Sequence, residues 1–175
     1  MNRWTLAWAT RMMTWLGFAA AGTAVAGPVD TLQPGQWYEF PDSQLEDVLP
    51  SPVPSGRTRS IMSSWSGGTF DTRRNRLIVW GGGHSDYAGN ELYAFDVPTG
   101  RWVRLTEPSS SPPSQRTYDH LEYLPNQDAL FVSPGGSRSP DGFADGNTYL
   151  FDFANSAWSN LGRPPSSSST FTYFN

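Results

Sequence analysis

The sequence repeats itself with a period slightly above 50 residues. Phe70–Gly83 aligns with Tyr123–Gly136, and a leucine, a valine and two glycines recur 53 positions later. A second set of positions recurs with a spacing of 56: Tyr93, Phe95, Asp96, Trp102 and Leu105 match Tyr149, Phe151, Asp152, Trp158 and Leu161. A repeat of this length forms one supersecondary unit, which buries its apolar face by stacking on its neighbours. The chain is therefore predicted to be a stack of such units.

Each repeat is predicted to form four β-strands. The expected strands are Trp65–Asp71, Arg76–Gly82, Glu91–Val97 and Arg101–Leu105 in the first repeat, and Thr117–Tyr123, Ala129–Gly135, Asn147–Phe153 and Ala157–Leu161 in the second. Turn sequences such as "PTG" and "LPNQ" separate them. The alternation in "LYAFD" and "TYLFD" is typical of pleated strands with one buried face. An all-β protein of four-stranded antiparallel units follows, with almost no helix outside the first residues.

The repeated positions resemble the kelch repeat, in which each unit is one four-stranded blade of a β-propeller. The segments "RLIVWGGG", "LYAFDVPTGRW", "QRTYDHLEYLP" and "TYLFDFANSAW", within Ser55–Leu161, carry the resemblance, which extends to the central domain of the galactose oxidase superfamily. It implies that Trp102 and Trp158 pack between neighbouring blades. Tyr93 and Tyr149 are expected to do the same, with their hydroxyls bonded to backbone.

The chain divides along these repeats into a segment 1–26, a lead-in 27–54, a first blade 55–107, a second blade 108–163 and the start of a third blade at 164–175. Because propellers have about four to eight blades, the sequence is interpreted as an N-terminal fragment of a longer ring. Self-assembly of short chains into a ring is the alternative.

The first 26 residues have the pattern of a signal peptide. Arg3 and Arg11 precede an apolar run that ends in Ala24-Val25-Ala26, a small-residue pattern suited to cleavage. The run is shorter than the roughly 20 apolar residues of a membrane span. We therefore expect a secreted or periplasmic protein that has no membrane contact after the signal peptide is removed.

Composition excludes two classes of function. The formal net charge is −4 and lysine is absent, which argues against nucleic acid as a partner because nucleic-acid binding requires a basic surface. Cysteine is also absent, so the chain encodes neither thiolate chemistry nor the Tyr–Cys crosslink on which the copper-radical activity of galactose oxidase depends. No cofactor is predicted.

Strand direction predicts one loop-bearing face. In an antiparallel blade, the loop between the second and third strands and the segment leading into the first strand lie at the same end. His84–Glu91, Ser114–His120 and Ser137–Gly146 are therefore expected to share one rim, and loops on a rigid frame commonly carry binding groups. The candidate catalytic residues on this rim are His84, His120, Tyr118 and Arg116, and the candidate binding residues are Asp86, Tyr87, Asn90 and Asp119.

The sequence supports a functional role differently for each of the two histidines. A histidine titrates near neutral pH and can act as a general base. The Arg-x-x-x-His pattern that ends at His120 resembles the usual start of kelch blades, where the histidine bonds to backbone. His84 has no repeat counterpart, since Ser137 stands 53 positions later. Zinc ligation by the histidines with Asp86 or Asp119, and calcium binding near Asp141 and Asp145, match no established spacing, so no metal site is predicted.

Two functions fit these observations. The first is an exported propeller module that binds a glycan or a protein through its rim. The alternative is a carbohydrate-active enzyme, such as a lyase of acidic polysaccharide that uses His, Tyr and Arg on the same rim, and this alternative rests on fold-level analogy.

Overall fold

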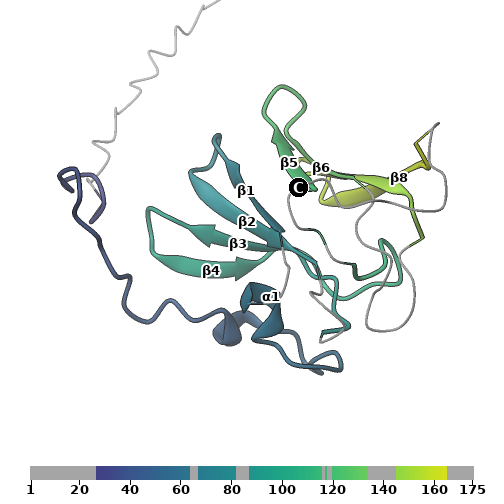
Figure 1. Cartoon of the computed structure of the whole chain (residues 1–175), viewed down its shortest axis with the longest axis horizontal. Coiled ribbons are helices and arrows are strands. Elements are labelled where there is room, and N and C mark those ends of the chain that lie inside the picture. The colour runs from purple at the N-terminus through teal and green to yellow at the C-terminus, as the bar shows by residue number, and fades with distance from the viewer. Residues whose placement is uncertain are drawn as a thin grey trace, which may run out of the picture.

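The protein is built from two four-stranded antiparallel sheets that lie side by side (Figure 1). The computed structural model describes residues 27–63, 67–81, 87–115, 117, 120–133 and 145–164. The strands are β1 (Gly67–Asp71), β2 (Arg76–Trp80), β3 (Tyr93–Asp96), β4 (Arg101–Arg104), β5 (Leu121–Leu124), β6 (Ala129–Val132), β7 (Thr148–Asp152) and β8 (Ala157–Gly162). Each sheet keeps its strands in chain order. These are two propeller-like blades, and the predicted all-β fold class is confirmed.

The repeat extends to the backbone conformation of the turns. Asn75 and Asp128, which are 53 positions apart, have φ values of 52° each, and Gly100 and Ser156, which are 56 apart, have φ values of 65° and 51°. Non-glycine residues seldom adopt this left-handed conformation, and asparagine and aspartate adopt it most readily. The same turn geometry therefore closes the corresponding hairpins of both blades.

One strand begins four residues later than predicted. The first strand of the second blade was expected from Thr117, but β5 begins at Leu121. The reason is a turn: the backbone N–H of His120 donates to the Thr117 carbonyl at 2.7 Å. The Thr117 hydroxyl in turn donates to the carbonyl of Trp80 at 3.0 Å. Thr117 thus connects the start of the second blade to the first blade and lies outside the strand.

Helix is scarce in the described ranges, as the sequence predicts. It consists of η1 (Leu45–Val48) and α1 (Ser60–Ser63), which both lie in the segment before β1. Leu45 and Ile61 from these turns pack with Val79 and Tyr93 on the first blade. The segment 43–63 therefore covers the face of the first blade that points away from the second.

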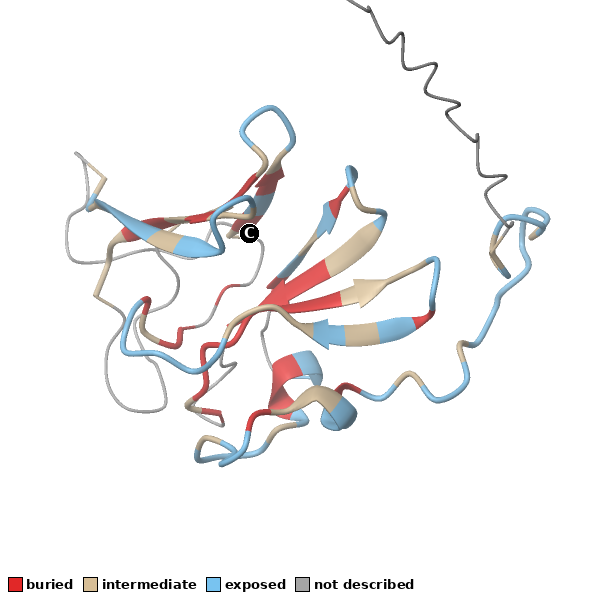
Figure 2. Ribbon diagram, turned by 180° about the vertical axis from the view of Figure 1, so that it is seen from behind, coloured by how far each residue is buried: buried red, intermediate tan, exposed pale blue. Residues whose placement is uncertain are grey.

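The main core lies between the two blades, with β1 in contact with β5. Ile78, Trp80, Leu92 and Ala94 of the first blade pack against Leu121, Leu130, Val132, Tyr149 and Phe151 of the second. The Trp80 ring is fully buried and lies 5.3 Å from the Trp158 ring, centroid to centroid. Figure 2 shows the buried positions running through the strands and into the connections at one end. The predicted place of Trp158 between blades is confirmed.

Tyr149 also lies in the core between the blades, as predicted, whereas Tyr93 and Trp102 pack with the lead-in on the opposite face of the first blade. Trp102 does not face the second blade, because its indole N–H donates to the carbonyl of Ser43 in the lead-in at 3.0 Å. The Tyr149 hydroxyl donates to the Asp145 carboxylate and not to backbone. Tyr93 is 1% exposed, and its hydroxyl has no hydrogen-bond partner among the described residues. For Tyr149, a side-chain carboxylate that the repeat pattern does not reveal takes the place of the expected backbone acceptor.

An ionic cluster joins the blades at the end opposite the long connections. Arg74 of the first blade donates through both terminal nitrogens to the Asp128 carboxylate of the second, at 2.7 and 2.6 Å. Asp71, whose side chain is 0% exposed, accepts from Arg74 at 3.0 Å and from Arg76 at 2.9 Å. The Tyr123 hydroxyl donates to Asp128 at 2.9 Å. We call these five residues the inter-blade clasp.

The clasp makes the free energy of unfolding depend on pH in the acid range. The hydrogen bonds from Arg74 lower the pKa of Asp128 from 3.8 to about 2. A lowered folded-state pKa means that this stabilisation is complete above about pH 4 and is lost as pH falls toward 2. The side chain is 16% exposed, and the shift corresponds to about 2 kcal/mol. We expect Asp128→Asn to flatten this part of the curve of unfolding free energy against pH, measured by urea denaturation; an unchanged slope would contradict the pairing.

Candidate functional site

The two ends of the blades differ in the length of their connections (Figure 1). Tight turns at 72–75, 97–100, 125–128 and 153–156 close the hairpins at one end. At the other end, residues 81–92 connect β2 to β3 and residues 105–120 connect the two blades. We call this second end the loop rim. Antiparallel pairing determines its position. In each blade, the connection from the second to the third strand lies at the same end as the segment that leads into the first strand.

Asn90 fixes the two long connections to each other. The residue is 4% exposed, and its side-chain amide nitrogen donates to the carbonyl and the hydroxyl of Ser109 at 3.0 and 3.1 Å. Its amide oxygen accepts the Ser109 backbone N–H at 2.9 Å. The carbonyl of Asn90 accepts the indole N–H of Trp80 at 2.8 Å. The candidate binding residue Asn90 is thus committed to internal bonds that shape the rim.

Tyr87 belongs to a buried polar cluster under the rim. The residue is 1% exposed, and its hydroxyl donates to the Glu91 carboxylate at 3.1 Å. Burial raises the pKa of Glu91 and, together with the adjacent Glu91 carboxyl, raises the pKa values of Tyr87 and Tyr93. Neutral side chains are therefore favoured here. Within the described residues, the second carboxyl oxygen of Glu91 has no hydrogen-bond partner.

The connection between the blades crosses the rim beside Tyr87. The Ser114 hydroxyl donates to the Tyr87 carbonyl at 3.3 Å, and Gln115 is 0% exposed. Gly81, with φ of 111°, lies so close that an added Cβ would be 2.9 Å from the Gln115 carbonyl and from Thr117. Only glycine fits that approach. Tyr87 and the described part of the connection between the blades therefore lie together on the loop rim.

His120 lies at the point where this connection becomes β5. It is half-buried, and its carbonyl accepts the backbone N–H of Ser133 at 3.0 Å. This backbone bond continues the β5–β6 ladder by one step. The backbone of His120 is thus fixed by the sheet at the rim, as a positioned side chain requires.

The remaining candidates, His84, Asp86, Arg116, Tyr118 and Asp119, lie outside the described residues. The predicted proximity of His84 to His120 stays a prediction. The predicted signal peptide 1–26 and most of the predicted third-blade segment 164–175 also lie outside those ranges. Neither a group of three metal-ligating side chains nor a helix long and apolar enough to cross a membrane occurs in the described part of the chain.

Sequence reasoning missed Glu91, Gln115 and the inter-blade clasp. Glu91 was read as the first residue of a strand, but its place beside Asn90 just before β3 gave one signal, because two polar residues interrupt an apolar pattern there. Gln115 and Asp71 carried no such signal, since their burial depends on which strands meet in three dimensions.

Comparison with protein-family models finds no family whose model matches this chain.

Proposed function

We propose that the protein is an exported kelch-type β-propeller module that binds a glycan through the loop rim. The observation that carries this proposal is the asymmetry of the blades: tight turns close one end, and two long connections, locked together by Asn90, form the other. Loops held by a rigid scaffold are the usual place for binding groups. The kelch assignment rests on the repeated positions of glycine, tyrosine and tryptophan.

The chemistry of the rim favours a hydrogen-bonding ligand. Residues 107–111, "EPSSS", are all exposed and carry a carboxylate and three hydroxyls. The exposed large apolar side chains of the described ranges lie elsewhere, in the lead-in, in α1 and in β1, β4 and β8. Protein partners are usually held by aromatic and apolar anchors at the centre of the interface. A rim whose described residues carry no such anchors suits the hydroxyl groups of a polysaccharide better.

The test is a calorimetric titration of the full chain with neutral and uronate-containing polysaccharides. We expect one class to bind, and we expect His84→Ala and His120→Ala each to weaken the affinity about 10-fold, which corresponds to about 1.4 kcal/mol. The matched control is Thr72→Ala, an exposed residue of the β1–β2 turn, which should leave affinity unchanged. Equal losses in all three variants, or no binding to any polysaccharide, would contradict the proposal.

The same samples distinguish binding from cleavage. A lyase acting on uronates by elimination forms an unsaturated product that absorbs in the ultraviolet. If absorbance rises with time, and if this rise is lost in His84→Ala, the protein is a lyase and not only a binding module.

A further inference from the structure

Glu91 is a buried acid that forms no ion pair within the described residues. The residue is 2% exposed, and one carboxyl oxygen accepts the Tyr87 hydroxyl at 3.1 Å. The other oxygen has no hydrogen-bond partner in the part of the chain that the structure describes. The positive charge of Arg104 acts on Glu91, but that guanidinium is bonded to Glu107 and to the Val48 carbonyl. An ionised carboxylate here would be buried with one hydrogen bond and no paired cation, which is costly.

Residues 87–90, which we call the rim lid, cover this carboxyl on the side of the loop rim. An added Cβ on Gly89 would collide with the unpartnered oxygen of Glu91, so the backbone of the lid packs directly on that oxygen. The lid is held in turn by the lead-in, because the Ala88 N–H donates to the Ser55 carbonyl at 2.9 Å. The carboxyl is therefore closed off from the rim by backbone that a few hydrogen bonds hold in place.

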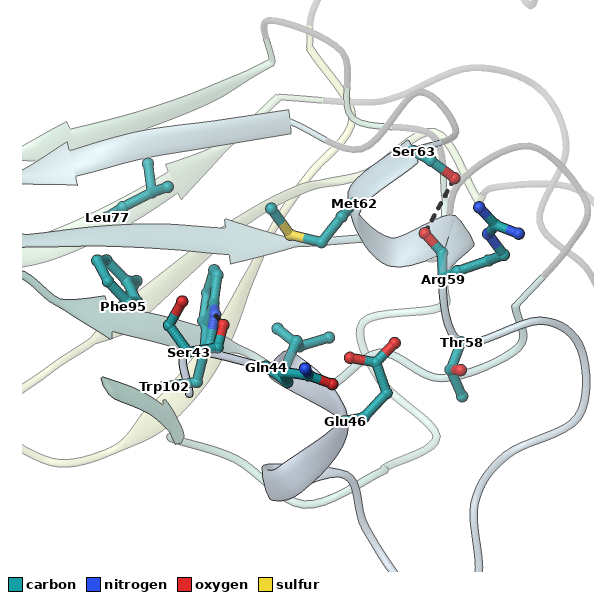
Figure 3. A pocket seen from close by; sticks show the side chains of 11 residues that line it. Ser43, Gln44, Glu46, Thr58, Arg59, Met62, Ser63, Leu77, Phe95 and Trp102 are labelled. Carbon is teal, nitrogen blue, oxygen red and sulfur yellow. Dashed lines mark hydrogen bonds between the residues drawn. The ribbon is translucent and has the colours of Figure 1, made fainter. Parts of the chain in front are cut away.

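The lead-in closes the other side of the cluster. Leu45 and Ile61 pack with Tyr93 against the first blade. Figure 3 shows the cleft of about 510 Å³ that remains between the lead-in and this face, beside Trp102. Neither Tyr93 nor Glu91 lines the cleft. The cleft therefore gives the Glu91 carboxyl no contact with solvent, and the rim lid is the barrier that has to move before water can hydrate it.

The surroundings of Glu91 favour its neutral form. Among the described residues, the charged or titratable groups on the elements around it are Tyr87, Tyr93, Arg104, Glu107 and the exposed lead-in residues Glu46, Asp47, Arg57 and Arg59. Burial has the largest influence and raises the pKa of Glu91; Arg104 lowers this pKa and Glu107 raises it. A raised folded-state pKa means that the closed lid is fully stable below the ordinary pKa of a glutamic acid. This stability is lost as pH rises through the raised pKa.

We propose that Glu91 is a proton-binding switch of the loop rim: protonated Glu91 keeps the rim lid closed, and its ionisation opens the lid. Opening releases one proton to solvent and exposes the carboxylate to water, which supplies the hydrogen bonds that the closed lid withholds. The lid includes Asn90, whose bonds to Ser109 fix the two long connections to each other. One buried side chain thus couples pH to the shape of the rim. This proposal does not rest on the proposed function, since it concerns the rim without ligand.

Amide hydrogen exchange of the full chain, followed by NMR without ligand from about pH 4 to about pH 9, tests the proposal. The protection factor, which is the intrinsic exchange rate divided by the observed rate, reports opening of the lid at the Ala88 N–H. We expect it to fall about 10-fold for each pH unit above the midpoint at which Glu91 ionises, because each opening releases one proton. Amides of β6, which is central in its sheet, should stay more protected than Ala88 at every pH.

Glu91→Gln keeps the shape of the protonated side chain and removes its titration. In this variant Ala88 should keep its protection up to the highest pH, and misfolding cannot produce such a gain. The histidines titrate in the same pH range, but they are unchanged in the variant and so do not account for a difference. The matched control is Glu122→Gln, which neutralises an exposed carboxylate of β5 and should show the pH dependence of the unaltered chain.

Tyr87→Phe shifts the switch without removing it. The hydrogen bond from the Tyr87 hydroxyl lowers the pKa of Glu91, so its loss should move the midpoint of lid opening to higher pH. A midpoint that moves to lower pH would contradict the role given to this bond.

Three further results would overturn the proposal. The first is protection of Ala88 that does not change with pH in the unaltered chain. The second is a Glu91→Gln variant that loses protection with rising pH as the unaltered chain does. The third is equal protection of Ala88 and β6 at high pH, because the lid would then open only when the whole protein unfolds.

Discussion

Replacing Trp80 with alanine is expected to lower the free energy of unfolding by about 3–5 kcal/mol, the range for large aromatic side chains removed from a core. Trp80 is 0% exposed, lies 5.3 Å from Trp158 across the blade interface, and donates its indole N–H to the Asn90 carbonyl at 2.8 Å. Alanine would leave a cavity between the blades and an unpaired carbonyl at the base of the rim. Urea denaturation followed by circular dichroism measures the loss.

Trp37→Ala is the matched control, because the same side chain is 95% exposed in the lead-in. Its loss should change stability by no more than about 0.5 kcal/mol. Equal effects of the two substitutions would contradict the assignment of the core to the contact between the blades.

Asp71→Asn is expected to destabilise the protein by about 3 kcal/mol, as breaking a buried ion pair does. Burial raises the pKa of Asp71, but the hydrogen bonds from Arg74 and Arg76 outweigh burial and hold that pKa below its ordinary value. The Asp71 carboxylate also accepts the backbone N–H groups of Arg73 and Arg74 at 3.0 and 3.1 Å. Asparagine cannot balance two guanidinium groups in this place.

Glu107→Gln is the control for Asp71→Asn. Glu107 pairs with Arg104 at 2.8 Å, but its side chain is 72% exposed, and exposed pairs contribute at most about 1 kcal/mol. A larger loss for Glu107→Gln than for Asp71→Asn, measured by the same denaturation, would show that burial does not decide the strength of these pairs.

The sequence predicted the elements of this fold because the repeat supplies the same answer twice. The glycines, tyrosines and tryptophans recur at fixed spacing, and the strands around Leu77 and Tyr93 are found where alternation places them. The start of β5 was misplaced because hydrogen bonds of Thr117 and His120, which are particular to the second blade, shorten the strand. A repeat reveals what its copies share and conceals what distinguishes them.

The site was less predictable than the fold for a related reason. Loop direction located the rim, but burial of individual side chains depends on packing between segments far apart in the sequence. Asn90 and Tyr87 look like exposed polar loop residues in the sequence, whereas they are 4% and 1% exposed and hold the rim in shape. The clasp joins residues more than 50 positions apart: Arg74 pairs with Asp128, and the neighbouring Arg73 approaches the same carboxylate at 3.4 Å. A repeat analysis aligns equivalent positions and does not reveal such pairs.

The loop rim is tested most directly by hydrogen exchange of the full chain, measured by mass spectrometry with and without the polysaccharide that binds in calorimetry. If the rim is the binding surface, the ligand should slow exchange in peptides covering 87–92 and 105–120. Peptides covering the turns at 72–75 and 125–128 should then exchange at unchanged rates. Slowed exchange at those turns, with none in the two long connections, would contradict the assignment of binding to the rim.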